Sequence, residues 1–348
     1  MRRRCGMGNL KLKSKHRLLC GDTADSDNVA RLVGDASLVM LHADPPYGMG
    51  KEKDGIANDN LYAEKLDKFQ MQWWNAWRTK TADNGSVYIW GNAPDLWRLW
   101  YQGGLQDSER LTMRNEIAWY KGGGGFNVGT EAGRMYFPNE RCLFFMIGEQ
   151  GFNNNADNYW HGWDGILHKL QKDCDAMGWT AKDIQRICGV GNYCHWFTES
   201  QWVFIPEEHY KKLQAEAKKV GEHDAFKREH DAFKREHDEL KREFYATRAF
   251  FNNTHDNMTD VWQFERVTGE ERHGHATPKP VEMMARAIKS SSNEGDAVGV
   301  PFAGTCPELI ACEQLNRRCY GMEIDPLYCD VIVKRWENLT GEKAVLNA

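Results

Sequence analysis

Short apolar runs alternate with helical patterns over the first 150 residues and again after residue 262. The runs predict strands because they are short, rich in apolar residues and bounded by glycine, proline or acidic residues. They cover residues 18–20, 37–41, 86–90, 115–120, 142–147, 296–300 and 319–322. Helical spacing of apolar positions predicts helices at residues 66–81, 281–289, 307–315 and 326–336. Strands that alternate with helices indicate an α/β sheet.

The segment between these two parts has a different pattern. From about residue 149 the chain becomes polar and aromatic, and residues 222–242 contain a seven-residue repeat, Glu-His-Asp-Ala-Phe-Lys-Arg, in three closely related copies. Positions spaced by three and four residues fall on one seam of a helix. The repeat therefore predicts a helical arm over residues 207–248, about 60 Å long at 1.5 Å per residue. Its histidines lie about 10 Å apart along such a helix, too far apart to share a metal ion.

A second helical pattern precedes the repeat. Residues 180–190 resemble the first helix and turn of a helix-turn-helix, and residues 192–197 would then form the helix that reads DNA. A generic helical hairpin remains an alternative. On the first interpretation, the side chains expected to contact DNA are Arg186, Asn192, Tyr193, His195 and Trp196.

Composition excludes several classes of protein. Hydrophobic residues make up 41% of the 348 positions, enough for a substantial core, and no run approaches the length of a membrane span. No apolar run follows the basic N-terminus, so a secretory signal is not expected and we expect a cytoplasmic protein. The net charge of −5 argues against a wholly basic nucleic-acid binder. Residues 1–20 nevertheless hold seven Lys or Arg and no acid, which predicts either a phosphate-contacting arm over residues 1–17 or a solvated tail.

The cysteines do not indicate a metal centre. The chain has ten of them, scattered and without a C-x-x-C pair, so we interpret them as reduced core residues. Zinc held by Cys188, Cys194 and His195 is the alternative, and it rests on spacing alone. No metal is therefore expected.

The sharpest chemical signal is Asp44-Pro45-Pro46-Tyr47, directly after a predicted buried strand. Ligands bind at that end of the strands in open α/β sheets. The carboxylate of Asp44 and the carbonyl of Pro45 could accept both hydrogen bonds of an exocyclic amine, while Tyr47 stacks on the ring. Two acceptors on one amine make its nitrogen more nucleophilic. A proline-rich turn without chemistry is the alternative.

Five segments together resemble S-adenosylmethionine-dependent DNA amino-methyltransferases in which the catalytic motif precedes the cofactor motif, as in prophage-borne members. They are residues 16–22, 44–47, 275–280, 301–305 and 322–325. The resemblance implies that Asp44, Pro45, Pro46 and Tyr47 are catalytic. It implies a cofactor site formed by Asp22, Asp44, Thr277, Lys279, Pro301, Phe302, Ala303, Gly304, Thr305 and Glu323.

The chain departs from this family in its glycine-rich loop. Val300 stands where the family has an acid, and Cys306 replaces a glycine. A missing charge-assisted hydrogen bond would weaken cofactor binding by about 1.5–3 kcal/mol. A Cβ at residue 306 would crowd a point where backbone approaches closely. A weakened DNA-binding relative is therefore one alternative function.

The resemblance implies a Rossmann-like methyltransferase fold with a mixed, mostly parallel seven-stranded sheet and an inserted, mainly helical target-recognition region. The catalytic half should cover residues 1–150, the target-recognition region residues 151–261 and the cofactor-binding half residues 262–348. The expected function is methyl transfer from S-adenosylmethionine to the N6 amine of adenine after base flipping. Cytosine-N4 methylation is the alternative, because that class shares the fold, although its catalytic motif usually begins with serine where this chain has Asp44.

The expected partner is double-stranded DNA in a bacterial or phage-encoded system, and no membrane is expected to take part. Two further relationships stay open at this point: a homodimer formed through the helical arm, and a partner nuclease of a restriction-modification pair. Sequence alone leaves the recognition sequence undetermined, because base contacts depend on which side chains reach the grooves.

Overall fold

The computed structural model describes residues 9–12, 16–50, 52, 57–121, 139–149, 159–221, 224–256, 258–269 and 278–347. The chain forms two compact units: unit 1 comprises Met1–Gly148 and Arg248–Ala348, and unit 2 comprises Glu149–Thr247. The sequence placed the inserted region at residues 151–261. Residues 248–261 instead belong with unit 1, where the strand Val261–Gln263 pairs with the sheet.

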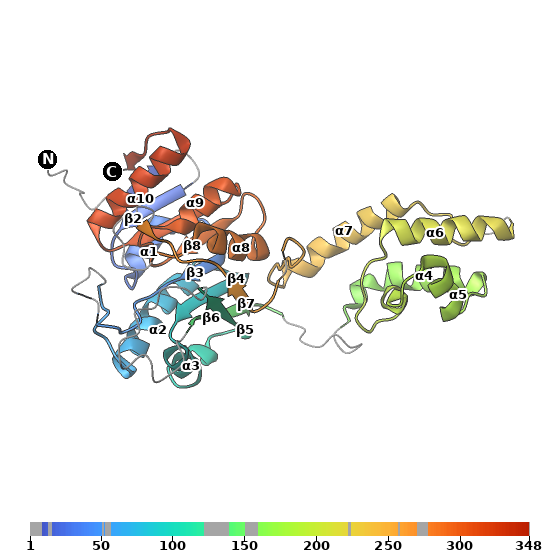
Figure 1. The fold of residues 1–348 in the computed structure, drawn as a ribbon, viewed down its shortest axis with the longest axis horizontal. Coiled ribbons are helices and arrows are strands. Elements are labelled where there is room, and N and C mark those ends of the chain that lie inside the picture. Colours follow the sequence, from blue (N-terminus) through green and yellow to red (C-terminus); the bar gives the residue numbers. More distant parts are fainter. Residues whose placement is uncertain are drawn as a thin grey trace. The chain divides into compact units, whose positions relative to one another are not determined.

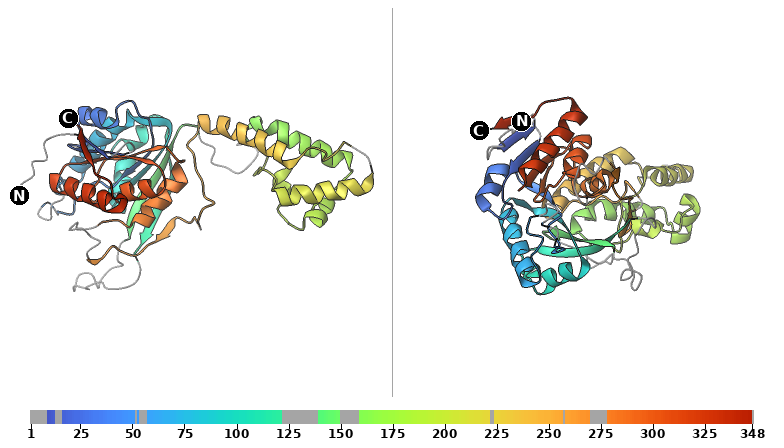
Figure 2. Two further views of the ribbon diagram at one scale, coloured as in Figure 1. Left: turned by 90° about the horizontal axis from the view of Figure 1, so that it is seen from above. Right: turned by 60° about the vertical axis from the view of Figure 1, so that its left-hand side comes forward.

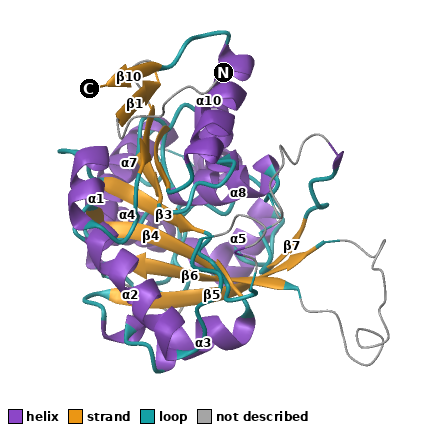
Figure 3. Cartoon of the chain, turned by 90° about the vertical axis from the view of Figure 1, so that its left-hand side faces the viewer, coloured by secondary structure: helices purple, strands orange, loops and turns teal. Residues whose placement is uncertain are grey.

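Unit 1 is built on one mixed sheet, which has ten strands within the described residues and the order β10-β1-β2-β9-β8-β3-β4-β6-β5-β7 (Figure 3). Five neighbouring pairs are parallel, and four are antiparallel. The strands are β1 (Asn9–Leu12), β2 (His16–Cys20), β3 (Leu38–Ala43), β4 (Thr81–Gly91), β5 (Leu111–Tyr120), β6 (Glu140–Ile147), β7 (Val261–Gln263), β8 (Ala297–Val300), β9 (Arg318–Glu323) and β10 (Val345–Asn347).

The predicted α/β class with a mixed sheet is confirmed, and the predicted number of seven strands is wrong. The additional strands are β1, β7 and β10, each three or four residues long. Such short strands show too few positions for an alternating pattern, and their pairing partners come from distant parts of the chain. Asn9, for example, pairs with Asn347, so β1 and β10 lie side by side at one edge of the sheet (Figure 3).

Helices cover both faces of the sheet (Figure 1). One layer consists of α1 (Ser26–Val33), α2 (Glu64–Arg78) and α3 (Ala93–Tyr101), with η2 (Leu105–Asp107) beside it. The other consists of α8 (Val281–Ser291), α9 (Pro307–Gln314) and α10 (Pro326–Thr340). The aromatic stripe of α2 faces the sheet: Trp73, Trp74 and Trp77 are at most 1% exposed. Burying these rings anchors α2 on its sheet face.

The parallel part of the sheet determines where ligands can bind. The strands β2, β9, β8, β3 and β4 run parallel to one another, so their carboxyl ends meet at one edge. Gly21 follows β2, Asp44 follows β3, Pro301 follows β8 and Ile324 follows β9. Segments far apart in sequence therefore converge at this edge, as they do at the binding crevice of other open α/β sheets.

Unit 2 is a helical bundle (Figure 2). Aliphatic and aromatic side chains form its own buried core. Its α-helices are α4 (Asp164–Ala176), α5 (Ala181–Cys188), α6 (Glu207–Ala217) and α7 (His230–Ala246). Single 3-10 turns occur at η5 (His161–Trp163), η6 (Tyr193–Trp196) and η7 (Lys218–Val220). Among the residues that the structure describes, no helix is both long and apolar enough to cross a membrane.

The continuous helix predicted over residues 207–248 is wrong. Helix α6 ends at Ala217, the chain turns at Gly221 with φ of 114°, and α7 starts only at His230. Phe226, from the first copy of the repeat, has φ of 55° and is 2% exposed. Its ring packs on Trp179 at 5.3 Å and on Tyr210 at 5.9 Å between centroids. These tertiary contacts outweigh the helical pattern that the first copy shares with the others.

The predicted helix-turn-helix is also wrong in its second half. Helix α5 begins with a capping box between Thr180 and Asp183 and ends at Gly189 with φ of 74°. The segment that should read DNA forms only the single 3-10 turn η6. Trp196 is 4% exposed there and stacks on His209 at 4.9 Å, so it stabilises the core of unit 2 and is not available to contact DNA.

Candidate active site

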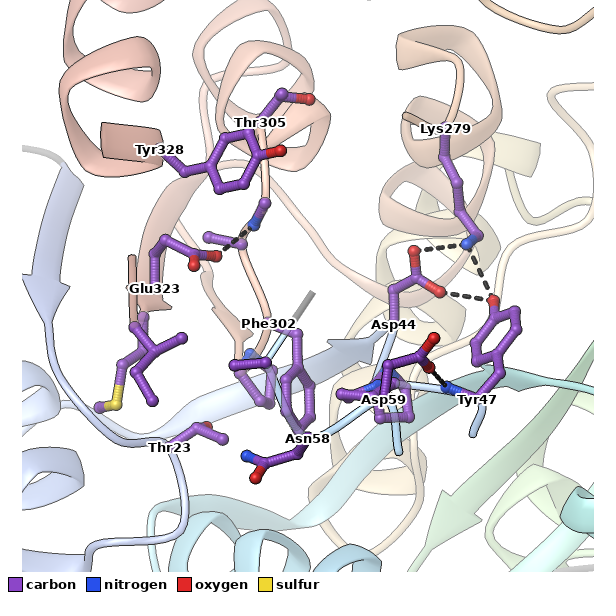
Figure 4. A pocket seen from close by; sticks show the side chains of 18 of the residues that line it. Thr23, Asp44, Tyr47, Asn58, Asp59, Lys279, Phe302, Thr305, Glu323 and Tyr328 are labelled. Atoms are coloured by element: carbon purple, nitrogen blue, oxygen red, sulfur yellow. Dashed lines mark hydrogen bonds and ion pairs between the residues drawn. The ribbon is translucent and has the colours of Figure 1, made fainter. Parts of the chain in front are cut away.

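A pocket lies in unit 1 at the carboxyl ends of β2, β3, β8 and β9 (Figure 4). Every described residue to which the sequence analysis assigned catalysis or cofactor binding lines this pocket. These residues are Asp22, Asp44, Pro45, Pro46, Tyr47, Lys279, Pro301, Phe302, Ala303, Gly304, Thr305 and Glu323. Thr277, the remaining candidate, lies outside the described residues.

Asp44 is at the centre of a network of charged side chains (Figure 4). Its Oδ1 accepts a hydrogen bond of 2.6 Å from the Tyr47 hydroxyl, and its Oδ2 lies 2.5 Å from Nζ of Lys279. Lys279 also donates to the Tyr47 hydroxyl oxygen at 3.0 Å and lies 3.3 Å from Oε2 of Glu140. Lys121 binds the other oxygen of Glu140. Lysines and carboxylates therefore alternate along this network, and Asp44, Lys279 and Glu140 are its members that line the pocket.

The pKa shifts in this network follow from burial and neighbouring charges. Burial alone would lower the pKa of Lys279, but Asp44 and Glu140 outweigh it and raise that pKa. Burial would raise the pKa of Glu140, whereas Lys279 and Lys121 outweigh it and lower that pKa. Burial, reinforced by Asp44 and Glu140, raises the pKa of Tyr47 well above its usual value. Near neutral pH the lysine and Glu140 are therefore charged, and the tyrosine is a hydrogen-bond donor.

Asp59 holds the backbone just after the two prolines. Its Oδ1 accepts hydrogen bonds of 2.9 Å from the backbone N–H groups of both Tyr47 and Gly48. The residue is 2% exposed. Gly48 has φ of 71°, a conformation that favours glycine, so the chain turns sharply at this point. Asp59 thus fixes the turn that presents Asp44 and Tyr47 to the pocket.

The opposite side of the pocket is built around Glu323, the last residue of β9 (Figure 4). Its Oε2 accepts a hydrogen bond of 2.7 Å from the backbone N–H of Gly304, and its Oε1 accepts one of 2.9 Å from that of Asp325. Burial raises the pKa of Glu323, and the backbone hydrogen bonds oppose that rise. The carboxylate is therefore oriented by the loop that follows β8.

Apolar side chains complete this side of the pocket. Phe302 packs edge-on against Trp73 at 5.5 Å between centroids, which keeps its ring in place at the pocket wall. Ile324 also lines the pocket and is 47% exposed. An oriented carboxylate beside flat apolar surfaces suits a nucleoside, because the carboxylate can accept from ribose hydroxyls while the base contacts the apolar groups.

The two departures from the family pattern lie in the protein core. Val300 is 0% exposed and packs in the cluster beneath α8 and α9, and it is not one of the residues that line the pocket. Cys306 is 2% exposed in the same cluster, with φ of 48°. The expected crowding of the pocket by Cys306 is therefore wrong, because its side chain packs into the core.

Most residues proposed from the sequence to contact DNA lie on or near the surface of unit 2. Arg186 and Asn192 are exposed, and Arg186 lies 3.6 Å from both Asp183 and Glu216. Tyr193 and His195 are half-buried, while Trp196 is in the core. In the described part of unit 2, these residues therefore do not lie together on one helix that could read DNA.

The N6/N4 DNA methylase family matches residues 38–334, which span the segment from β3 to α10. The chain belongs to the DNA methylase family. This match covers both sides of the pocket, from Asp44 to Glu323, as well as unit 2. The family match therefore includes most of the candidate active site, while Gly21, Asp22 and Thr23, which also line the pocket, precede the matched residues.

Relatives of this methylase include type II methyltransferase M.HpaI of Haemophilus parainfluenzae, 32% identical over 325 residues that cover 92% of this chain and 74% of that protein. DNA adenine methyltransferase YhdJ of Escherichia coli is 23% identical over 304 residues, or 86% of this chain and 76% of that protein. The cytosine-N4-specific PvuII DNA methyltransferase has a similar fold, with a TM-score of 0.52 and 10% identity over 94% of this chain and 91% of that chain.

Three acids of the methylase pocket escaped the sequence analysis: Asp59, Glu140 and Glu308. Glu140 starts β6, which runs antiparallel to β4, so its amino end lies at the same edge as the carboxyl ends of the parallel strands. A prediction that β6 pairs antiparallel with β4 would have placed Glu140 at the pocket. Asp59 comes from a loop and Glu308 from the first turn of α9, and neither belongs to a recognisable motif.

Proposed function

We propose that this methylase transfers a methyl group to the N6 amine of adenine in double-stranded DNA. The proposal rests chiefly on Asp44, an acid at the first position of the Asp-Pro-Pro-Tyr segment, which lines the same pocket as Glu323 and the loop after β8. The cofactor is S-adenosylmethionine, which supplies an activated methyl group when bound in this pocket.

The residues present fit that cofactor. Glu323 would accept hydrogen bonds from the ribose hydroxyls, since each of its oxygens keeps a free lone pair beside its bond to a backbone N–H. Phe302 and Ile324, which line the pocket, would hold the purine. Asp22, which follows β2, would bind the polar edge of the cofactor adenine, and the backbone of residues 301–305 would hold the methionine portion.

The target amine binds on the Asp44 side of the pocket. Asp44 Oδ1 and the carbonyl of Pro45 accept one hydrogen bond each from N6, and the two prolines keep these acceptors in a rigid backbone. Holding both amine hydrogens opposes conjugation of the nitrogen lone pair with the ring and leaves it available for the methyl group. Lys279 keeps a positive charge 2.5 Å from Oδ2, which leaves Oδ1 of Asp44 to accept from the amine.

Extrusion of the base from the duplex costs a few kcal/mol. Stacking of the flipped adenine on the Tyr47 ring returns about 1–3 kcal/mol of that cost. Asp59 holds the backbone of Tyr47, so the ring has a defined position from which to make this contact.

Unit 2 is the part of the chain that we assign to target recognition. Its Arg186 and Asn192 are exposed, which supports these two sequence-derived candidates for phosphate or base contacts. Arginine is the side chain best suited to either contact, because its planar group donates two parallel hydrogen bonds.

The test is to identify the modified nucleoside. Purified protein is incubated with unmethylated plasmid and S-adenosylmethionine carrying a deuterated methyl group, and the digested DNA is analysed by mass spectrometry. Labelled N6-methyldeoxyadenosine is expected. Labelled N4-methyldeoxycytidine would show that cytosine is the target, and label in neither nucleoside would favour a relative that has lost its activity.

A further inference from the structure

We propose that Glu308 binds the α-ammonium group of S-adenosylmethionine and is the anionic partner of the cofactor's methionine end. The inference rests on the proposed function, because it concerns the same pocket and the same cofactor. It adds a residue to the binding site that sits outside all five of the segments by which the chain resembles its family.

Glu308 is the second residue of α9 and lines the pocket together with Thr305 and Pro307. Its side chain is 4% exposed. One carboxylate oxygen, Oε1, lies 2.8 Å from Nδ1 of His42. The other oxygen, Oε2, is buried and has no hydrogen-bond partner. Nδ1 of His42 also has no hydrogen-bond partner, so its approach to Oε1 is a close contact and not an aligned hydrogen bond. The protein therefore leaves Oε2 of this buried acid without a partner.

His42 does not neutralise the charge of Glu308. Nε2 of His42 accepts a hydrogen bond of 2.8 Å from the indole N–H of Trp90, which can only donate. That nitrogen therefore carries no proton, the proton of the ring is on Nδ1, and the imidazole is neutral. The N-terminus of α9 favours a negative charge at Glu308, but a helix end supplies only a partial positive charge. The guanidinium of Arg335 acts on Glu308 through its charge, but it donates its hydrogen bond to the carbonyl of Thr305. Oε2 of Glu308 thus has no hydrogen-bonded cationic partner within the protein.

The other acids of the pocket already have partners within the protein. Asp44 and Glu140 are bound by lysines, Asp59 accepts from two backbone N–H groups, and Glu323 accepts from two more. Asp22 is exposed at the pocket mouth, where water can reach it, and accepts from the backbone N–H of Ala24. The supporting contacts are those of Asp44 and Glu140 with Lys279, of Asp59 with Tyr47 and Gly48, of Glu323 with Gly304 and Asp325, and of Asp22 with Ala24.

The position of Glu308 matches the methionine end of the ligand. His42, its neighbour, stands on β3 two residues before Asp44, which receives the target amine. Thr305 stands three residues before Glu308, in the loop that also carries the N–H group bound by Glu323. Glu308 thus lies between the Asp44 side of the pocket, through its contact with His42, and the Glu323 side, through the loop that contains Thr305. An ammonium group is the partner that a buried carboxylate binds best, through a short charge-assisted hydrogen bond.

The experiment compares two ligands that differ only in the ammonium group. S-adenosylhomocysteine and its deaminated analogue, with hydrogen in place of the ammonium, are titrated calorimetrically into the wild-type protein and the variant E308Q. Glutamine keeps the size of the side chain and removes its charge. We expect E308Q to bind S-adenosylhomocysteine about ten- to hundred-fold more weakly than the wild type. Its affinity for the deaminated analogue should stay within about two-fold of the wild-type value.

The ratio of the two affinities is the decisive quantity, because misfolded protein lowers the number of binding sites and leaves Kd unchanged. E313Q is the matched control: Glu313 lies on the same helix and pairs with His16 and Trp336, away from the pocket. E313Q should keep the wild-type ratio. If E308Q does not fold, E308D retains the charge at a shifted position and should weaken S-adenosylhomocysteine binding selectively, by a smaller factor.

If E308Q weakens the binding of both ligands equally, Glu308 only supports the shape of the pocket. If E308Q leaves the binding of both ligands unchanged, Glu308 plays no part in binding. Either result overturns the inference. S-adenosylmethionine is titrated as a third ligand. Weaker binding of S-adenosylmethionine alone, without an effect on S-adenosylhomocysteine, would assign the charge of Glu308 to the sulfonium and would also overturn the inference. Failure of the wild-type protein to bind any of these ligands would instead refute the proposed function itself.

Discussion

The hydroxyl of Tyr47 donates a hydrogen bond of 2.6 Å to Oδ1 of Asp44. Tyr47 is the residue proposed to stack on the target base, and Asp44 is the residue proposed to bind its amine, so the two side chains bind each other in this structure. Both functions require the two side chains to separate when the base enters. The amine then replaces the tyrosine hydroxyl at Oδ1, while Lys279 remains at Oδ2.

This exchange predicts different effects for two substitutions of Tyr47. Y47F keeps the ring and removes the competing hydroxyl, so kcat/KM for DNA should equal or exceed the wild-type value. Y47A removes the stacking surface and should lower kcat/KM about five- to hundred-fold, corresponding to about 1–3 kcal/mol. Steady-state methylation of one duplex measures both. Equal losses in the two variants would show that the hydroxyl itself takes part in the reaction.

Glu140 should make stability depend on acid pH. Its pKa in the folded protein is lowered from the usual value of 4.5. The stabilisation is therefore complete above about pH 4.5 and is lost as the pH falls through the folded pKa. E140Q should be less stable than the wild type at pH 7, and the difference should shrink as the solution is acidified. Urea unfolding from pH 7 to about pH 3 measures it.

The control for Glu140 is Glu116 on the neighbouring strand β5. Glu116 lies 3.6 Å from Arg141, and both side chains are about one-third exposed. Such a pair contributes at most about 1 kcal/mol. E116Q should therefore leave the pH dependence of unfolding unchanged. A stability difference for E140Q that stays constant as the pH falls from 4.5 to about 3 would contradict the assigned role of the lysines.

Asp59 should act on catalysis through the backbone of Tyr47. D59A leaves two backbone N–H groups without their acceptor and should cost about 1–3 kcal/mol of stability. It should also lower kcat, whereas the affinity for S-adenosylhomocysteine should change little. D59N keeps an acceptor oxygen and should recover part of both losses. A D59A enzyme with normal kcat and reduced stability would reduce Asp59 to a purely structural role.

Arg186 tests the assignment of DNA contacts to unit 2. R186A should weaken DNA binding and lower the slope of log K against log salt by about one, because one phosphate contact is lost. W196A provides the contrast, since Trp196 is in the core: it should destabilise unit 2 by about 3–5 kcal/mol. Filter binding at several salt concentrations and thermal unfolding separate the two effects. An unchanged salt slope for R186A would remove this residue from the DNA interface.

The sequence predicted the parts of the fold that depend on local patterns. The strands that pair at the centre of the sheet have apolar runs, and the residues that follow them, such as Asp44 and Glu323, therefore could be placed at one edge. Glu140 could not, because its position depends on the antiparallel pairing of β6 with β4. Glu308 was missed for a similar reason: its distance from His42 depends on the packing of α9 against β3.

Unit 2 shows where local patterns fail. The copies of the seven-residue repeat are nearly identical, yet the first copy turns at Phe226 and the later copies form α7. The difference comes from the packing of Phe226 on Trp179 and Tyr210, which no periodicity in the sequence reveals. Short strands such as β7 escaped prediction because they too depend on distant partners.

The central claim is that the carboxylate of Asp44 holds the amine of an extruded adenine. Single-turnover methylation of a duplex with D44A tests it most directly, alongside calorimetric binding of S-adenosylhomocysteine to show that the pocket is intact. The account predicts a rate of N6-methyladenine formation lowered about 10²- to 10³-fold while the ligand still binds. A D44A enzyme that methylates adenine at the wild-type rate would contradict it.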